Sequence, residues 1–167
     1  LLEWSKKQLG KIDVVKETLD IHKISVEAVG LVSGQAGDKE IELINEIPSG
    51  TTAFADSYMI TLVLRNLLSN AIKFSHPKGN VRLSCQQSEG MLEITVTDNG
   101  VGISEEDMPR LFKLDVHHTT YGTNNEKGAG LGLILAQEFI NENSGSIQVK
   151  STPGELTEFR FSLPLSG

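Results

Sequence analysis

The chain has 167 residues, a hydrophobic fraction of 38%, a charged fraction of 22% and a net charge of −7. These values describe a globular domain with its own core, and they argue against a protein that wraps nucleic acid, which needs a basic face. The sequence holds no apolar run long enough for a membrane helix, and its single cysteine, Cys85, excludes an internal disulfide and suits a reducing compartment.

The first third of the chain predicts two helices and two strands. Leu1–Leu9 has the apolar stripe of the end of a helix. A second helix is expected after Asp20. Its apolar residues recur at helical spacing: Ile21, Ile24, Ala28 and Leu31. Ile41–Ile47 and Thr51–Ala55 then predict two strands around a Pro-Ser-Gly turn.

The rest of the chain predicts a long helix followed mainly by strands. Asp56 is the expected cap of a helix that runs to about Ser75. Alternating apolar residues predict four further strands: Val81–Gln86, Leu92–Asp98, Ser146–Ser151 and Thr157–Pro164. Because helices are segregated from mostly antiparallel strands, the expected class is α+β. We expect a two-layer α/β sandwich, with a mixed, mostly antiparallel sheet packed on three main helices.

A long polar loop leads into a glycine-rich helix start. Ser104 and Asp107 are expected to cap a short helix that ends at Phe112, and Leu114–Lys127 is a loop long enough to act as a lid. The loop ends at Gly128–Phe139, whose sequence is GAGLGLILAQEF. Glycines at a helix start allow backbone N–H groups to approach a phosphate. A glycine-rich turn that only packs closely remains the alternative.

Two amides and one ammonium line one edge of the long helix. At 100° per residue, Asn66, Asn70 and Lys73 fall within about 60° of one another, beside an apolar stripe. An amide oxygen suits Mg²⁺, which leaves most of its coordination to phosphates and water. A lysine close by can meet a phosphate as a point charge. The alternative interpretation is a solvated helix edge.

A carboxylate stands on the apolar face of a predicted strand. Asp98 continues the alternation of the apolar residues in LEITVTD, and Thr157 stands on the apolar parity of the last strand. A carboxylate that faces the core without a partner is unfavourable. One alternative is that a backbone or lysine partner satisfies Asp98 locally, and another is that the strand ends before it. The functional interpretation is that Asp98 and Thr157 bind the polar edge of a ligand in an apolar pocket. Gly100 and Gly102 would then allow a tight turn and a close approach of the ligand.

Four stretches together resemble the sensor histidine kinases. NLLSNAIKFS, DNGVGI, Leu111–Phe112 and GAGLGL stand in the order of the asparagine box, first glycine box, phenylalanine box and second glycine box of that family. STPGELTEFRFSLPL resembles the closing strands, so the resemblance covers nearly the whole chain. It implies the Bergerat-type ATP-binding fold that histidine kinases share with gyrase-type ATPases, Hsp90 and MutL.

The resemblance implies catalytic roles for three residues of the asparagine box: Asn66, Asn70 and Lys73. Asn70 would ligate a Mg²⁺ that bridges the ATP phosphates, Asn66 would support that metal and its water, and Lys73 would contact phosphate. In the hydrolytic relatives a glutamate stands at the place of Asn66 and activates water. An amide cannot take that proton, so the resemblance implies transfer to an outside acceptor instead of hydrolysis.

The other end of the ATP would lie at the first glycine box. Asp98 would accept a hydrogen bond from the adenine amino group, with Thr157 nearby and Gly102 giving the ring room. The remaining cofactor-binding residues implied by the resemblance belong to the two glycine boxes: Gly100, Gly128, Gly130, Gly132 and Leu133.

The resemblance also predicts the domain organisation and the partners. Residues 1–12 are expected to be the remnant of the second dimerisation and histidine-phosphotransfer helix, and residues 13–167 the catalytic ATP-binding domain. The acceptor histidine would lie on a helix hairpin outside this chain. The fragment is expected to be monomeric and cytoplasmic, and its parent a homodimer that serves a response-regulator receiver domain.

Three other functions remain open at this point. A gyrase-, Hsp90- or MutL-like hydrolase shares the boxes, but Asn66 argues against it. A non-catalytic nucleotide-binding or docking module would keep the boxes as relics. A protein-serine kinase of the anti-sigma type shares them as well, and the helix remnant at Leu1–Ile12 is the feature that argues for the histidine kinase.

Overall fold

The structure is a computed structural model that describes residues 13–113 and 132–167. The expected helix remnant at residues 1–12 and the expected lid lie outside the described residues, as do Gly128 and Gly130. In the part that is described, no helix is long and apolar enough to cross a membrane.

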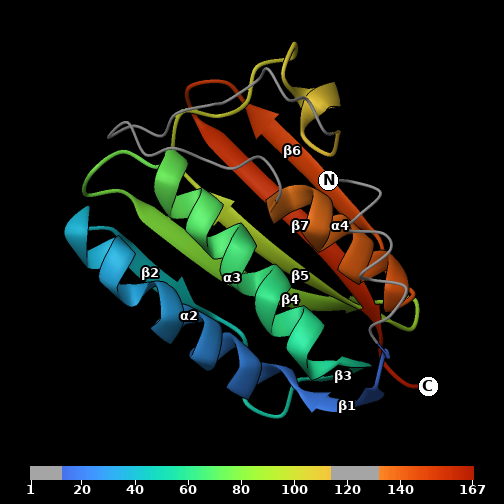
Figure 1. The fold of residues 1–167 in the computed structure, drawn as a ribbon. Coiled ribbons are helices and arrows are strands. Elements are labelled where there is room, and N and C mark those ends of the chain that lie inside the picture. The colour runs from blue at the N-terminus through green and yellow to red at the C-terminus, as the bar shows by residue number, and fades with distance from the viewer. Residues whose placement is uncertain (1–12, 114–131) are drawn as a thin grey trace.

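A five-stranded sheet forms one layer of the sandwich (Figure 1). Its strands, in spatial order, are β2 (Glu42–Asn45), β4 (Asn80–Ser88), β5 (Met91–Asp98), β7 (Leu156–Pro164) and β6 (Ile147–Thr152). β2 is parallel to β4, and the other neighbours are antiparallel. The predicted mixed, mostly antiparallel sheet is therefore confirmed.

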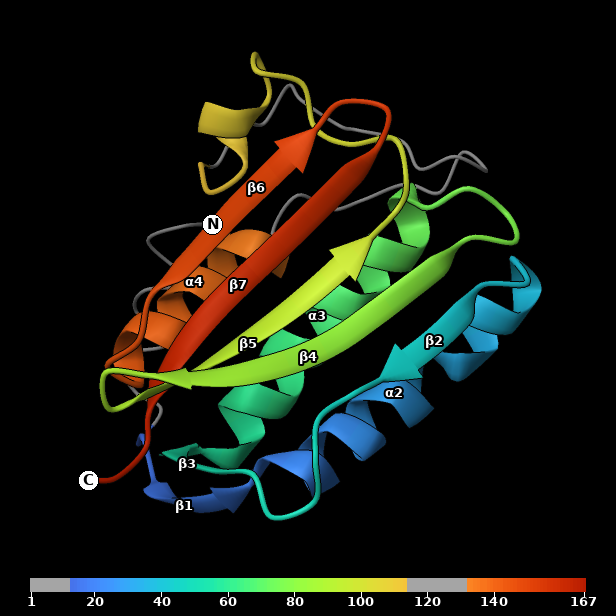
Figure 2. The same cartoon turned by 180° about the vertical axis from the view of Figure 1, so that it is seen from behind.

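The described helices form the second layer. They are α2 (Ile21–Asp38), α3 (Ser57–Phe74) and α4 (Gly132–Glu142). All three cover the same face of the sheet, with α3 between the other two, and Figure 2 shows that none of these described helices lies on the opposite face. Their apolar sides and the inward residues of the strands make one core, so the expected α+β sandwich is confirmed.

Helix α3 forms because a cap and a broad apolar stripe coincide. Asp56 Oδ1 accepts a hydrogen bond from Met59 N at 3.0 Å, as the sequence predicted for the first turn. The buried apolar residues recur every three or four positions along α3: Met59, Ile60, Val63, Leu64, Leu67, Leu68, Ala71 and Ile72. This stripe fixes the rotation of α3 and thereby decides which side chains lie along its polar edge.

The last turn of α3 is closed by groups from several segments. Ser75 Oγ donates to Ala71 O at 2.7 Å, and Val101 N donates to Phe74 O at 3.1 Å. The two carbonyls between them belong to Ile72 and Lys73, and the buried ammonium of Lys39 donates to both at 3.0 Å. A helix leaves its last four carbonyls without partners inside the helix, and here each of the four has one from outside.

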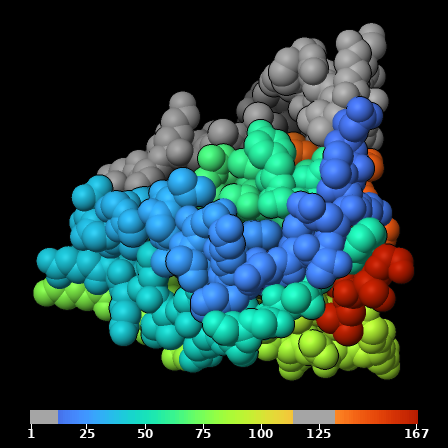
Figure 3. All heavy atoms as spheres, turned by 90° about the horizontal axis from the view of Figure 1, so that it is seen from below, coloured from blue at the N-terminus to red at the C-terminus, as the bar shows by residue number. Residues whose placement is uncertain are grey.

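A separate two-stranded sheet was not predicted in full. β1 (Lys16–Asp20) pairs antiparallel with β3 (Thr52–Asp56), so Thr51–Ala55 is a strand, but it does not pair with β2. Asp56 Oδ2 also accepts from Val15 N at 2.9 Å. Figure 3 shows this side of the molecule, where the C-terminal end of the chain lies beside the small sheet of β1 and β3.

Two expectations about helices were wrong in detail. Leu31 is 61% exposed, because the buried stripe of α2 continues from Ala28 to Val32 and Ala36 and does not include it. The short helix after Ser104 is a 3₁₀ turn at Met108–Arg110. Ser104 Oγ does accept from Asp107 N at 3.1 Å, so the capping hydroxyl was placed correctly.

We predict that the ammonium of Lys39 stabilises the end of α3. Lys39→Met leaves two buried carbonyls without their charged donor, and we expect the free energy of unfolding to fall by about 1.5–3 kcal/mol. Urea unfolding followed by circular dichroism measures it. Lys78→Met is the matched control, because the Lys78 side chain is 80% exposed and its removal is expected to change stability by less than about 0.5 kcal/mol. Equal effects of the two substitutions would contradict the prediction.

Candidate functional site

A row of polar side chains crosses the helix-covered face of the sheet at one end. Asp98 on β5 is directly opposite Thr157 on β7, and Thr157 is opposite Ser151 on β6. Asp98 is 3% exposed and Thr157 5%. The inward orientation predicted for both is therefore confirmed, and Ser151 is an addition that the sequence analysis did not single out.

Asp98 is a buried carboxylate that has a local hydrogen-bond donor. Its Oδ1 accepts a hydrogen bond from Gly100 N at 3.0 Å. Burial raises the pKa of the Asp98 carboxyl to about 6, and the Gly100 hydrogen bond acts in the opposite direction. The local partner anticipated from the sequence thus exists, but burial still outweighs it. Perturbed carboxyls of this kind are candidates for functional groups.

The turn after Asp98 needs glycine at both positions, because each lies against backbone atoms of another segment. A Cβ at Gly100 would collide with the Phe74 carbonyl, which this turn approaches through Val101 N. Gly102 has φ +72°, and a Cβ there would lie 2.6 Å from Thr152 O. The space at Gly102 is therefore occupied by the β6–β7 hairpin, and its expected role of giving room to an adenine ring stays a prediction.

Ser151 ties this turn to the strands beside it. Its Oγ accepts from Ile103 N at 2.7 Å and donates to Leu156 O at 2.9 Å. The same oxygen lies 3.0 Å from Thr157 Oγ1. One hydroxyl thus holds the end of the glycine turn, the hairpin and the buried Thr157 together.

The polar edge of α3 lies beside the glycine turn. Lys73 is buried, and its ammonium stands 4.8 Å from the centre of the Phe74 ring, a cation–π distance. Asn66 and Asn70 are half-buried on the same helix. Because Phe74 O receives the hydrogen bond from Val101 N, the last turn of α3 contacts the turn that follows Asp98. The structure therefore brings the asparagine box and the first glycine box together.

The first residue of α4, Gly132, lies beside Asn66 on the polar edge of α3. Asn66 Nδ2 lies 3.5 Å from Gly132 O, a long contact, and a Cβ on Gly132 would come within 3.6 Å of Asn66 Cγ. Leu133 is half-buried and packs against the core. The third glycine of the second glycine box is thus beside α3.

The described residues hold no dedicated metal cage. Among them, no group of three or more His, Cys, Asp and Glu side chains could hold a metal ion. Mg²⁺ is commonly bound by one or two protein oxygens together with phosphates and water. The amide oxygen of Asn70 has the chemistry of one such protein ligand.

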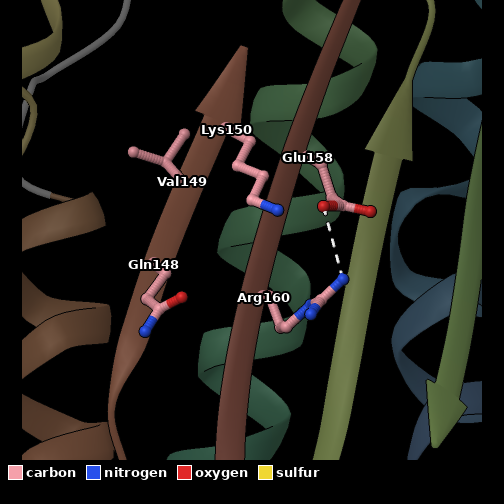
Figure 4. Close-up of a pocket in the computed structure, with 5 residues that line it drawn as sticks. All are labelled: Gln148, Val149, Lys150, Glu158 and Arg160. Atoms are coloured by element: carbon pink, nitrogen blue, oxygen red, sulfur yellow. Dashed lines mark ion pairs between the residues drawn. The ribbon is translucent and has the colours of Figure 1, made fainter.

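A small hollow lies on the uncovered face of the sheet, among the residues that the structure describes. Figure 4 shows a hollow of about 40 Å³ there, lined by Gln148, Val149, Lys150, Glu158 and Arg160. An ion pair of 3.5 Å between Arg160 and Glu158 spans it. Ligand pockets usually have several hundred Å³, so this hollow is too small for a nucleotide.

Two residues that organise the site were missed by the sequence analysis. Ser151 follows Ile147 and Val149 on the inward parity of β6, which is the signal that identified Asp98. Lys39 has no such signal, because its partners on α3 lie 33 and 34 residues away.

Comparison with known proteins identifies the family to which the chain is similar. The family described as histidine kinase-, DNA gyrase B-, and HSP90-like ATPase matches residues 55–167. The chain is 33% identical, over 99% of its length and 20% of the relative's, to the Non-motile and phage-resistance protein of Caulobacter vibrioides. It is 30% identical, over 98% of its length and 43% of the relative's, to the sensor-like histidine kinase SenX3 of Mycolicibacterium smegmatis.

Solved structures give the same fold. The crystal structure of full-length ShkA in complex with AMPPNP superposes with a TM-score of 0.77 at 27% identity, over 93% of this chain and 32% of that one. The chain spans less than half of the length of the two curated relatives above. The chain belongs to the histidine kinase-, DNA gyrase B- and HSP90-like ATPase family, in which it matches the ATP-binding catalytic domain of sensor histidine kinases.

Proposed function

We propose that this domain binds ATP with Mg²⁺ and transfers the γ-phosphate to a histidine on a dimerisation hairpin of the same parent kinase. It would act in two-component signalling, with a response-regulator receiver domain as the later partner and the cytoplasm, where ATP is available, as its location. Residues 13–167 would be the catalytic unit. The family and the likeness to sensor histidine kinases support this proposal.

The observation that carries the proposal is the buried carboxylate of Asp98. A protein does not usually retain a buried acid whose pKa is raised to about 6 unless the acid has a task. Asp98 and Thr157 offer hydrogen-bonding oxygens at the end of an otherwise apolar sheet face. That arrangement suits the amino edge of a planar, mostly apolar ring such as adenine.

The phosphates would lie along the polar edge of α3. Asn70 would offer its amide oxygen to the metal, Asn66 would orient water on it, and Lys73 would face a phosphate as a point charge. Mg²⁺ would offset the phosphate charge that an acidic domain of net charge −7 repels. Gly128, Gly130 and Gly132 would bring backbone N–H groups to the phosphates, and Leu133 would line the same site.

The amide at Asn66 favours transfer over hydrolysis. An asparagine side chain has no basic group that could take a proton from water, so the domain would hold ATP without splitting it rapidly. Catalysis would then consist of positioning the phosphoryl group and stabilising its charge until an acceptor arrives. A gyrase-like hydrolase is the second candidate. It would need a carboxylate at position 66 to activate water, and the residue there is asparagine.

We predict metal-dependent binding of ATP that needs Asp98. A fluorescent ATP analogue titrated into the domain with Mg²⁺ is expected to bind in the micromolar range, about −8 kcal/mol. Removing Mg²⁺ with a chelator weakens binding, because the phosphates then face the acidic domain alone. Asp98→Asn is expected to weaken binding at least tenfold, because an amide can turn a donor toward the amino group of the ring.

Asp38→Asn is the matched control for this titration. It removes the same charge from an exposed position at the end of α2, and binding is expected to stay within twofold. A folded wild-type domain that does not bind the analogue would refute the ATP site and leave a docking module. Equal binding by wild type and Asp98→Asn would refute the adenine contact alone.

We predict that Asp98 lowers stability at neutral pH. Because its pKa is raised in the folded state, the favourable contribution of the protonated carboxyl is complete below pH 3.8 and is lost as the pH rises through about 6. Asp98→Asn is therefore expected to raise the free energy of unfolding by about 1–3 kcal/mol at pH 8. The difference between variant and wild type is expected to disappear near pH 4, and urea unfolding at both pH values measures it. A difference that does not change with pH would contradict the assignment.

A further inference from the structure

The hydroxyl of Ser151 has its full set of hydrogen bonds, and counting them fixes their direction. A serine hydroxyl donates once and accepts twice. Leu156 O can only accept, so the Ser151 proton goes there, over 2.9 Å. Ile103 N can only donate, so it takes one acceptor position of Ser151 Oγ, at 2.7 Å. The remaining contact, 3.0 Å to Thr157 Oγ1, is a hydrogen bond only if Thr157 is the donor.

This direction determines what Thr157 can offer to a ligand. Its single proton is used toward Ser151, so the remaining capacity of Thr157 Oγ1 is that of an acceptor. Thr157 faces the covered side of the sheet directly opposite Asp98, which is itself an acceptor when ionised. The end of the sheet face therefore presents two adjacent acceptors.

We propose that Ser151 is a positioning residue that sets nucleotide specificity by holding Thr157 as a hydrogen-bond acceptor beside Asp98. The inference rests on the proposed nucleotide site. Two acceptors suit a ring that carries an exocyclic amino group, because that group brings two N–H donors. They oppose a ring with an oxo group at the same position, because oxygen lone pairs then face one another. Ser151 thereby favours 6-aminopurine over 6-oxopurine nucleotides without touching either.

Loss of the Ser151 hydroxyl is expected to relax this specificity. In Ser151→Ala the proton of Thr157 loses its acceptor and can turn toward the ligand. Thr157 can then donate to an oxo group, so inosine triphosphate gains affinity relative to ATP. We expect the ratio of ATP to inosine triphosphate affinity to fall about three- to tenfold, the worth of one hydrogen bond.

The test is competition of ATP and inosine triphosphate against a fluorescent ATP analogue, with Mg²⁺ at pH 8, where Asp98 is ionised. It uses the wild type, Ser151→Ala, Thr157→Val and the double variant. The affinity ratio is expected to fall in Ser151→Ala, and adding Ser151→Ala to Thr157→Val is expected to leave the ratio unchanged. Ser151→Thr keeps the hydroxyl and is expected to keep the wild-type ratio. If Ser151→Ala does not fold, Ser151→Cys gives the same readout, because a thiol is a weak acceptor.

A purely structural role would give different results. If Ser151→Ala weakened both nucleotides equally, or changed the ratio as much in the Thr157→Val background, the proposed role of Ser151 would be refuted while the nucleotide site stood. If the folded wild type bound neither nucleotide, the proposed function would fail, and this inference with it.

Discussion

The closed carbonyl end of α3 is the constraint on which the rest of the molecule depends. The Lys39 ammonium joins the segment after α2 to this helix end, and Val101 N joins the glycine turn to it. Gly100 is needed for that second contact, because any side chain there would strike Phe74. The buried apolar residues of α3 fix the rotation of the helix about its axis, and the hydrogen bonds from Lys39 and Val101 fix the position of its last turn. The polar edge of α3 and the carboxylate of Asp98 consequently have a defined separation.

Much of this arrangement could be predicted because it is periodic. Alternation along β5 and β7 gave the inward orientation of Asp98 and Thr157, and the helical period gave the shared edge of Asn66, Asn70 and Lys73. The order of the motif boxes then identified the family and with it the fold. The inward parity of Ser151 carried the same signal, but a serine at the end of a strand is common and only its three partners make it informative.

The rest could not be predicted, because it depends on contacts between distant segments. Lys39 lies in a polar stretch that resembles any solvated turn, and only the folded chain places its ammonium on α3. β1 has a single buried residue, Leu19, so its sequence shows no alternation that would mark a strand. Leu31 fits the helical period of α2 but falls on the exposed side, because the apolar stripe drifts around the helix toward Val32.

The small sheet formed by β1 and β3 also makes a mechanical connection. β3 leads directly into α3 through Asp56, whose second oxygen holds Val15 N at the near end of β1. The hydrogen bonds of an antiparallel pair lie across the strands, so a force along β1 loads them together in shear. Tension on the segment before β1 would therefore be carried into the first turn of α3, the helix whose opposite end borders the candidate site. The two strands thus connect residues 15–20 to the central helix of the domain through hydrogen bonds.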